Sequence, residues 1–268
     1  MSGPMTVSVS GGRTSALMLR RLMDAGRVLA NPACHVLFAN TGREREETLE
    51  FVRDLSRYWN VRITWLEWAP KDAGGFRVVT FETASRRGEP FEALIRVRRF
   101  LPNPVTRFCT QELKVRPMRE FMKAQGFEHW TNCVGIRADE PRRVARMRQE
   151  RPRERFDVEL PLADAGVTVS DVNEFWSRQP FTLRLQQHEG NCDLCFLKRV
   201  GDRVRIANER PDLAAWWHRM ESETGKTFRK EGSLAQLQAL AARRRAALEA
   251  QQDLFTCFCG DDAEEAAA

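Results

Sequence analysis

The sequence has 268 residues, of which 42% are hydrophobic and 30% are charged, a balance that is ordinary for a soluble globular protein. It holds no run of about 18 apolar residues, and its first residues lack the basic and apolar regions of a signal peptide, so we expect neither a membrane span nor secretion. The net charge of +6 favours an anionic partner, either a nucleotide or a nucleic acid. We therefore expect a cytoplasmic protein.

Strands and helices alternate over the first quarter of the chain. An apolar, β-branched segment at residues 6–10 predicts a buried strand, and the helical spacing that follows it ends at Gly26. Residues 34–40 and 61–68 predict two more strands, on either side of a helix over residues 44–59. The order strand, helix, strand, helix, strand indicates a parallel sheet with right-handed crossovers.

The pattern is less regular further along. The remaining predicted elements are an exposed basic helix over residues 90–101, a helix over 113–125, strands over 129–136 and 156–162, a helix with Ser170 as its N-cap, and helices over 211–224 and 233–250. We expect a mostly parallel α/β sheet flanked by helices over residues 1–189 and a helical, cysteine-containing region over residues 190–260 that packs on it. An acidic, Ala-rich end over residues 261–268 predicts disorder.

A glycine-rich loop at residues 10–15 joins the first strand to the first helix. Its two glycines let the backbone turn tightly and bring amide groups close to a phosphate, and the helix adds N–H groups and the positive end of its dipole. The hydroxyl groups of the loop add donors, and its arginine adds charge. A glycine motif this short also fits an ordinary strand-to-helix turn. The loop consists of Ser10, Gly11, Gly12, Arg13, Thr14 and Ser15.

Five of the seven cysteines have the spacing of ligands or catalytic groups, as expected for clustered cysteines in a reducing compartment. Cys192 and Cys195 form a CxxC pair whose thiolates can meet one metal ion or cluster. Cys109 precedes a predicted helix, and Cys257 and Cys259 lie near the end of the chain. Three or four of these thiolates can hold an iron–sulfur cluster; a zinc site and a redox dithiol are the alternatives.

The other two cysteines, Cys34 and Cys133, lie in apolar predicted strands, so we expect both in the core. The adjacent Trp216 and Trp217 are also expected to pack inside. No catalytic histidine is predicted, because the four histidines show no HxxxH or comparable spacing.

Arginine is concentrated between residues 137 and 155. Arg137 follows directly after a predicted strand, where α/β sites form, and a guanidinium binds phosphate or sulfate with two parallel hydrogen bonds. Lys114 and Arg116 are expected to meet the same anion. The arginines of residues 146–155 predict a solvated helix instead. A second basic cluster at residues 96–99 leaves a nucleic-acid partner open.

Five segments resemble one superfamily in the order in which that superfamily has them. The loop at residues 10–15 (SGGRTS) is similar to the PP-loop of the adenine nucleotide α-hydrolases, which include N-type ATP pyrophosphatases and phosphoadenosine phosphosulfate reductases. The other matching segments are residues 38–44 (FANTGRE), 109–118 (CTQELKVRPM), 135–143 (GIRADEPRR) and 190–199 (GNCDLCFLKR). The resemblance implies a Rossmann-like fold that binds an adenine nucleotide, with Asn40, Thr41, Gly42 and Gly135 near it.

Two departures from the family pattern bear on the reaction. The ATP-cleaving members usually carry Asp at the position of Thr14, where it helps to hold Mg²⁺, so Thr14 favours phosphates held by neutral donors and basic groups. Asp139 or Glu140 can still supply a carboxylate for ATP. Many sulfonucleotide reductases hold a [4Fe–4S] cluster through a Cys-Cys pair and a CxxC, whereas here Phe108 precedes Cys109.

The fourth ligand must then come from elsewhere, or be absent. Cys257 and Cys259 are the candidates, and the resemblance also assigns a catalytic role to a C-terminal cysteine. A cluster with three ligands and an open iron would suit sulfur donation to an RNA base.

These patterns favour a phosphoadenosine phosphosulfate reductase-like enzyme that acts on an adenine nucleotide, either phosphoadenosine phosphosulfate or ATP with Mg²⁺. Its expected catalytic residues are Lys114, Arg137, Cys257 and Cys259, and its expected cluster ligands are Cys109, Cys192, Cys195 and Cys257. Two alternatives stay open: ATP-dependent sulfur insertion into a base of tRNA or DNA, and a non-catalytic nucleotide or nucleic-acid sensor with a structural metal. A thiol reductant, a nucleic-acid partner and a homo-oligomer also stay open.

Overall fold

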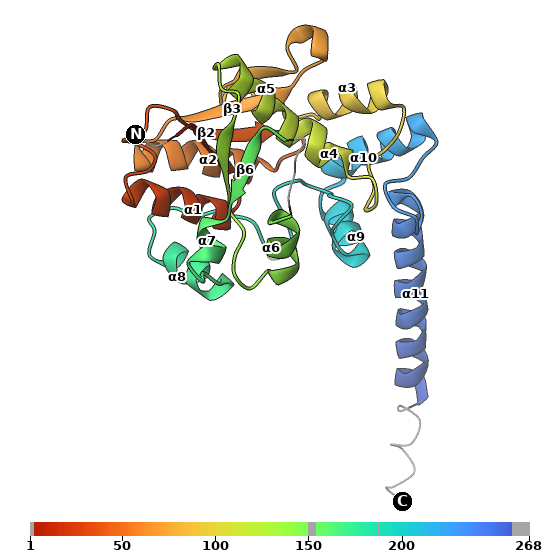
Figure 1. Ribbon diagram of the computed structural model, residues 1–268. Coiled ribbons are helices and arrows are strands. Elements are labelled where there is room, and N and C mark those ends of the chain that lie inside the picture. Colours follow the sequence, from red (N-terminus) through yellow and green to blue (C-terminus); the bar gives the residue numbers. More distant parts are fainter. Residues whose placement is uncertain (1–2, 150–153, 187, 259–268) are drawn as a thin grey trace, which may run out of the picture. The chain divides into compact units, whose positions relative to one another are not determined.

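The computed structural model (Figure 1) describes residues 3–149, 154–186 and 188–258, and side chains as far as residue 249. The chain divides into two compact units. The first consists of Met1–Arg98 and Thr106–Asp193, and the second of Arg99–Val105 and Leu194–Ala268. Cys259 and the predicted tail at residues 261–268 lie outside the described residues.

A six-stranded sheet with the order β4-β3-β2-β1-β5-β6 forms the centre of the first unit. Neighbouring strands run parallel, except that β4 is antiparallel to β3. The strands are β1 (Met5–Val9), β2 (Cys34–Asn40), β3 (Ile63–Trp68), β4 (Phe76–Val79), β5 (Trp130–Val134) and β6 (Phe156–Glu159). The predicted α/β class with a mostly parallel sheet is confirmed. The short edge strand β4 was missed, because four half-exposed residues give little pattern.

The direction of the strand order reverses at β1. The chain places β2, β3 and β4 on one side of β1, and then β5 and β6 on the other side. In open α/β sheets, ligands bind outside the carboxyl ends of the strands at such a point. The loop at residues 10–15 follows β1 directly, so it lies at the position where a ligand site is expected.

Both faces of the sheet are covered. On one face, α1 (Arg13–Asp24) and α2 (Glu46–Trp59) share a core with Val36 and Phe38 of β2. On the other face, Leu37 of the same strand packs with residues of α5 (Arg116–Ala124). Successive side chains of a strand point to opposite faces, which explains why β2 is apolar throughout.

Five further helices and two irregular turns complete the ordered elements described for the first unit. These elements are η1 (Lys71–Ala73), α3 (Glu89–Arg98), α4 (Phe108–Thr110), the π-helical turn η2 (Gln111–Val115), α6 (Pro141–Met147), α7 (Pro161–Asp164) and α8 (Val169–Ser177). Two expectations are corrected here. The helix α3 is half buried rather than exposed, because its apolar residues at positions 91, 94 and 95 share one face. The N-cap of α8 is Thr168, which forms a capping box with Asp171, not Ser170.

The second unit is helical where it is described. Its helices are α9 (Val200–Glu209), α10 (Pro211–Thr224) and α11 (Leu234–Phe258), and α9 packs against both others. Trp216 and Trp217 are buried as predicted, and the ring centroids of Trp217 and Phe228 lie 4.5 Å apart. In the part of the chain that the structure describes, no helix has the length and apolar character needed to cross a membrane.

Candidate nucleotide and thiol site

The phosphate loop (residues 10–15) owes its shape to a glycine and a serine. Gly11 has a φ of 77°, and a Cβ there would lie 2.4 Å from Thr48 Cγ2 of α2, so this close turn requires glycine. Ser15 Oγ accepts a hydrogen bond from Ser10 N at 3.0 Å and donates one to the Gly12 carbonyl at 2.9 Å. The Ser15 hydroxyl therefore closes the loop on itself.

The start of α1 offers donors to an anion. Gly12 is the N-cap residue and has no side chain with which to accept from the first N–H groups of the helix. Trp176 of α8 donates from Nε1 to the Arg13 carbonyl at 2.9 Å, which fixes this first turn. Thr14 is half-buried at the loop, whereas the Arg13 side chain is exposed. The expected contact of this turn and of the Thr14 hydroxyl with a phosphate stays a prediction.

Arg137 comes to this loop from the end of β5. Its Nη1 lies 3.4 Å from Thr14 Oγ1, which places a cation beside the predicted phosphate position. Gly135 makes the approach possible, because a Cβ there would lie 2.7 Å from the Ser15 Cα. The loop and the predicted anion-binding arginine are therefore adjacent in the first unit.

The carboxylates that follow Arg137 are engaged by arginines. Asp139 Oδ1 accepts from Arg137 Nε at 2.8 Å, and its Oδ2 accepts from Val169 N at 3.2 Å. Burial acts to raise the pKa of Asp139, but these hydrogen bonds outweigh it and lower the pKa. Glu140 pairs with Arg143 and accepts from the Arg137 backbone N–H. Both carboxylates therefore support Arg137.

The turn after β2 is held by a buried network. Asn40 is fully buried, and its Nδ2 donates to Glu67 Oε1 at 2.6 Å and to the Ser85 carbonyl at 2.8 Å. Its Oδ1 accepts from Gly42 N at 3.1 Å, and Gly42 itself has a φ of 78°. The Asn40 side chain thus shapes the turn. Thr41 and Gly42 are buried as well, and their expected contact with a nucleotide stays a prediction.

Glu44 and Lys114 form an ion pair next to this turn. The Glu44 side chain is fully buried, and its Oε1 accepts from Lys114 Nζ at 3.0 Å and from Thr41 Oγ1 at 3.1 Å. Burial acts to lower the pKa of Lys114, but Glu44 overcomes this effect, and the thiols of Cys192 and Cys109 add to the upward shift. Lys114 therefore stays protonated, with two predicted ligand cysteines within electrostatic range.

The segment that carries Cys192 is fastened to the same turn. Asn191 donates from Nδ2 to the Ser10 carbonyl at 2.7 Å, and its own carbonyl accepts from Arg45 N at 2.7 Å. Cys192 forms an isolated bridge with Glu44. Two further arginine–carboxylate pairs, Arg43–Asp193 and Arg45–Glu189, are buried or nearly so. Residues 189–193 thus lie against both the phosphate loop and the turn after β2.

These anchoring residues were not singled out by the sequence. Glu44, Arg43 and Arg45 lie in or beside a matched segment, but charged residues after a strand are read as solvent-facing unless their partners are known. Glu67 is the clearer omission. It is the only acid in a mostly apolar predicted strand, which is an available signal for a buried carboxylate that holds polar groups.

The predicted cluster ligands are divided between the two units. Cys109 and Cys192 are half-buried near Lys114 in the first unit, whereas Cys195 belongs to the second unit. The side chain of Cys257 and the whole of Cys259 lie outside the description. Within the described residues, no three Cys, His, Asp or Glu side chains are grouped to hold a metal ion. The ligand set expected from the sequence therefore stays a prediction.

Next to Cys195 in the second unit, an arginine is buried with unused donors. Arg203 is fully buried and donates from Nε to the Leu194 carbonyl at 3.2 Å. Its Nη1 and Nη2 have no hydrogen-bond partner among the described residues. Burial lowers the pKa of Arg203, although Glu221 and Cys195 act against this shift. An anionic group beside Cys195 would satisfy these donors.

Cys34 and Cys133 are both core residues, as predicted. Cys133 is completely buried, and Cys34 packs half-buried against the same core. Burial raises the pKa of Cys34 to about 11 and the pKa of Cys133 to about 12. We therefore expect both thiols to be unreactive near neutral pH.

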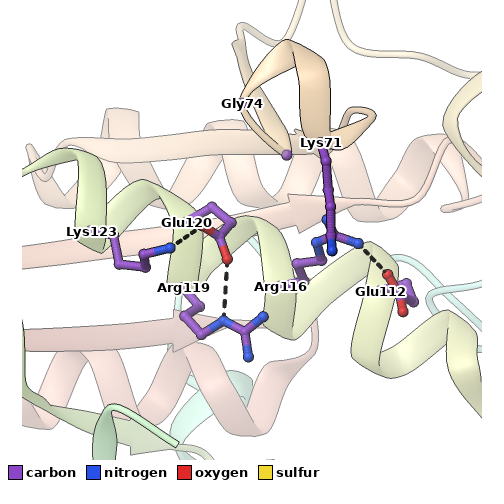
Figure 2. Close-up of a pocket in the computed structure, with 8 residues that line it drawn as sticks. Lys71, Gly74, Glu112, Arg116, Arg119, Glu120 and Lys123 are labelled. Atoms are coloured by element: carbon purple, nitrogen blue, oxygen red, sulfur yellow. Dashed lines mark hydrogen bonds and ion pairs between the residues drawn. The ribbon is translucent and has the colours of Figure 1, made fainter.

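Arg116 does not join Lys114. The two residues are two positions apart in a continuous helical stretch, so their side chains leave it on different sides. Arg116 Nη1 pairs with Glu112 Oε2 at 2.8 Å and lines a separate pocket, shown in Figure 2. The expected contact of Arg116 with the nucleotide stays a prediction without geometric support.

The fold is an α/β sheet that carries a glycine-rich loop at its switch point. The family model of the phosphoadenosine phosphosulfate reductase domain matches residues 4–179. The chain is also 31% identical over 217 residues to the uncharacterized nin region protein ORF290 of Escherichia phage lambda, and the match covers 75% of this chain and 68% of that protein. The chain belongs to the phosphoadenosine phosphosulfate reductase family.

A solved structure with a similar course of the chain is the U34-tRNA thiolase NcsA from Methanococcus maripaludis with its [4Fe-4S] cluster. It is 11% identical, with a TM-score of 0.39, and the match covers 82% of this chain and 68% of that one. A likeness at this level says nothing about the reaction.

Proposed function

We propose that the protein is a sulfonucleotide reductase-like enzyme that binds a phosphoadenosine nucleotide at the phosphate loop and reduces the sulfuryl group that the nucleotide carries. The observation that supports this most is the cation at the loop, where Arg137 Nη1 lies 3.4 Å from Thr14 Oγ1. The carboxylates of Asp139 and Glu140 are both engaged by arginines. An anion held by N–H groups, a hydroxyl and a guanidinium needs no metal ion.

The proposed reaction is a sulfur transfer in two steps. A cysteine thiolate attacks the sulfuryl sulfur, and the S–O bond to the nucleotide breaks with its electron pair left on the phosphate. A second thiol then attacks the cysteine sulfur, which releases sulfite and leaves a disulfide that a dithiol reductant opens. Cys259 is the proposed nucleophile, and Cys257 is its alternative.

Lys114 and Arg137 would act on charge rather than on bonds. The phosphate becomes more negative as the S–O bond breaks, and preorganised cations lower the energy of that state. Lys114 is suited to this role because its raised pKa keeps it charged. Glu44 accepts from its ammonium group and is itself held by the Thr41 hydroxyl, so Lys114 acts without reorganisation.

A cluster bound by Cys109, Cys192, Cys195 and Cys257 is a separate proposal. Metal analysis of anaerobically purified protein tests it, with each cysteine changed to serine in turn and Cys133→Ser as the core control. Several irons with matching labile sulfide per chain, absent from the ligand variants, are expected. A colourless protein that contains zinc would contradict the cluster.

Calorimetry without metal ions tests the nucleotide proposal. We expect the wild type to bind 3′-phosphoadenosine 5′-phosphosulfate in EDTA more tightly than it binds ATP with Mg²⁺. Arg137→Ala should weaken that binding by about 10- to 100-fold, since a hydrogen bond to a charged group contributes about 1.5–3 kcal/mol. The matched control is Arg178→Ala, which removes an exposed arginine that caps the end of α8 and pairs with Glu174. Equal weakening in both variants would contradict the proposed role of Arg137.

ATP-dependent sulfur insertion into a nucleic-acid base is the second candidate. It is favoured by the buried Glu44 Oε2, which has no hydrogen-bond partner among the described residues and would accept from a metal-bound water. Turnover of ATP to AMP that is stimulated by tRNA or DNA would support this candidate over the first. The fold is the same in both cases, so it does not separate them.

A further inference from the structure

A charged pocket lies away from the phosphate loop, between the β3–β4 hairpin and the outer side of the helix that includes η2 and α5 (Figure 2). Its volume is about 560 Å³. Gly75 allows the hairpin to approach the helix, because a Cβ there would lie 3.1 Å from Glu120 Cγ. The lining residues are Lys71, Gly74, Gly75, Glu112, Arg116, Arg119, Glu120 and Lys123.

The lining is entirely charged side chains and glycine, with four cations and two carboxylates, so its net charge is +2. Each carboxylate is already shared by two cations. Glu112 pairs with Arg116 and with Arg98, which lies just outside the lining. Lys71 has no ion pair among the described residues, and Figure 2 shows it reaching from the hairpin toward the helix. Positive charge therefore remains for a ligand.

The second carboxylate shows the same arrangement. Glu120 pairs with Lys123 at 2.7 Å and with Arg119 at 3.4 Å. Flanking ions do not cancel the surplus, because Arg98 adds one positive charge and Glu154, which lies 3.6 Å from Arg119, adds one negative charge. Both lining carboxylates have lowered pKa values, since their cations outweigh the opposing effect of burial, so the count holds at neutral pH.

The helical residues of the lining form a row. Positions 112, 116, 119, 120 and 123 follow one side of the helix, over about 16 Å at the rise of an α-helix. This length spans several successive phosphates of a nucleic-acid strand. A protein interface would normally add an apolar centre, and base recognition would normally add aromatic stacking, whereas this lining is wholly charged or glycine.

We propose that this pocket binds the phosphodiester backbone of a nucleic acid, without reading its sequence. The inference goes beyond the proposed function, which requires only a nucleotide. Arg116 leaves the helical stretch on a different side from Lys114, so a strand held in the pocket would be bound on a surface separate from the one where Glu44 and Lys114 meet.

Fluorescence anisotropy with a labelled oligonucleotide of mixed sequence tests the proposal. The variant is Lys71→Glu with Lys123→Glu, and the control is Lys226→Glu with Lys230→Glu, which makes the same charge change at lysines of the second unit. We expect the affinity to fall at least tenfold in the pocket variant and less than threefold in the control. The slope of log K against log salt should decrease by about 0.7–0.9 for each phosphate that the variant no longer neutralises.

Three results would overturn the proposal: no oligonucleotide binding by the wild type, an equal fall in affinity in the two variants, or an acidic peptide of equal charge that competes as well as the oligonucleotide. The last result would indicate an acidic protein partner. Single-stranded and duplex forms of DNA and RNA are compared in the same assay to define the preferred strand. Circular dichroism and nucleotide calorimetry on both variants confirm that the fold is intact. Failure of the wild type to bind a nucleotide would refute the proposed function but not the proposed binding of nucleic acid at the pocket.

Discussion

The buried pair of Arg43 and Asp193 offers a direct test of how the cysteine segment is held. The two side chains are only 6% and 3% exposed, so neither charge is screened by water. Arg43→Met leaves the Asp193 carboxylate buried without its cation, and such a change costs about 3–5 kcal/mol. This is a large share of the total stability of a domain, which is about 5–15 kcal/mol.

The expected readouts are stability and the reactivity of one thiol. Urea unfolding of Arg43→Met should show the reduced free energy of unfolding. Alkylation of Cys192, followed by peptide mapping, should become faster, by about tenfold for each 1.4 kcal/mol by which the free energy of local opening falls. The double change Arg43→Met with Asp193→Leu should recover most of the stability, because a buried pair can be replaced by apolar groups at little cost. Arg178→Ala serves as the control.

Additive effects of the two substitutions on the free energy of unfolding would show that the pair is not coupled. If Arg43→Met and Asp193→Leu each cost less than about 1 kcal/mol and the double variant shows their sum, then the two side chains are not coupled. Unchanged alkylation of Cys192 in a destabilised Arg43→Met protein would show that the pair supports the fold but does not fasten the segment.

Three further predictions concern the same unit. Gly135→Ala should destabilise the protein by about 1–3 kcal/mol in urea, because the added Cβ would lie 2.7 Å from the Ser15 Cα; a neutral change would contradict that packing. Cys34 and Cys133 should resist iodoacetamide at pH 8 in the folded protein, since burial raises their pKa values to about 11 and about 12; rapid labelling at pH 8 would refute this. Lys114→Met should remove the stabilising ion pair with Glu44. Because the pKa of Lys114 is raised in the folded state, this stabilisation is complete below the ordinary lysine pKa and is lost only as pH rises through the raised value. The unfolding free energies of wild type and variant should therefore differ by a constant amount from pH 7 to about 9.

Much of the fold follows from residue patterns. The predicted boundaries of β2 and α10 agree with the structure, because both are bounded by strong signals, an apolar run in one case and a proline in the other. The sequence also anticipates the phosphate loop at the end of β1. The edge strand β4 and the π-helical turn before α5 were out of reach, since short elements depend on neighbours that are distant in sequence.

The site could be anticipated only in part. Sequence order indicated that Arg137 follows a strand, and the structure places it beside Thr14. It could not indicate that the hydroxyl of Ser15 and the amide of Asn40 are consumed by internal hydrogen bonds. The sequence also could not show that the side chains of Lys114 and Arg116 leave the helix on different sides, because that depends on the helical phase across the π-helical turn.

Product analysis tests the central claim most directly. The full-length protein is incubated anaerobically with 3′-phosphoadenosine 5′-phosphosulfate labelled with ³⁵S and a dithiol reductant, and sulfite and the released nucleotide are measured together. Our account predicts labelled sulfite and phosphoadenosine phosphate in equal amounts, with the rate strongly reduced in Arg137→Ala and retained in Arg178→Ala. Our account would be contradicted if no sulfite is formed in this incubation and AMP is formed from ATP in a second incubation with ATP and nucleic acid.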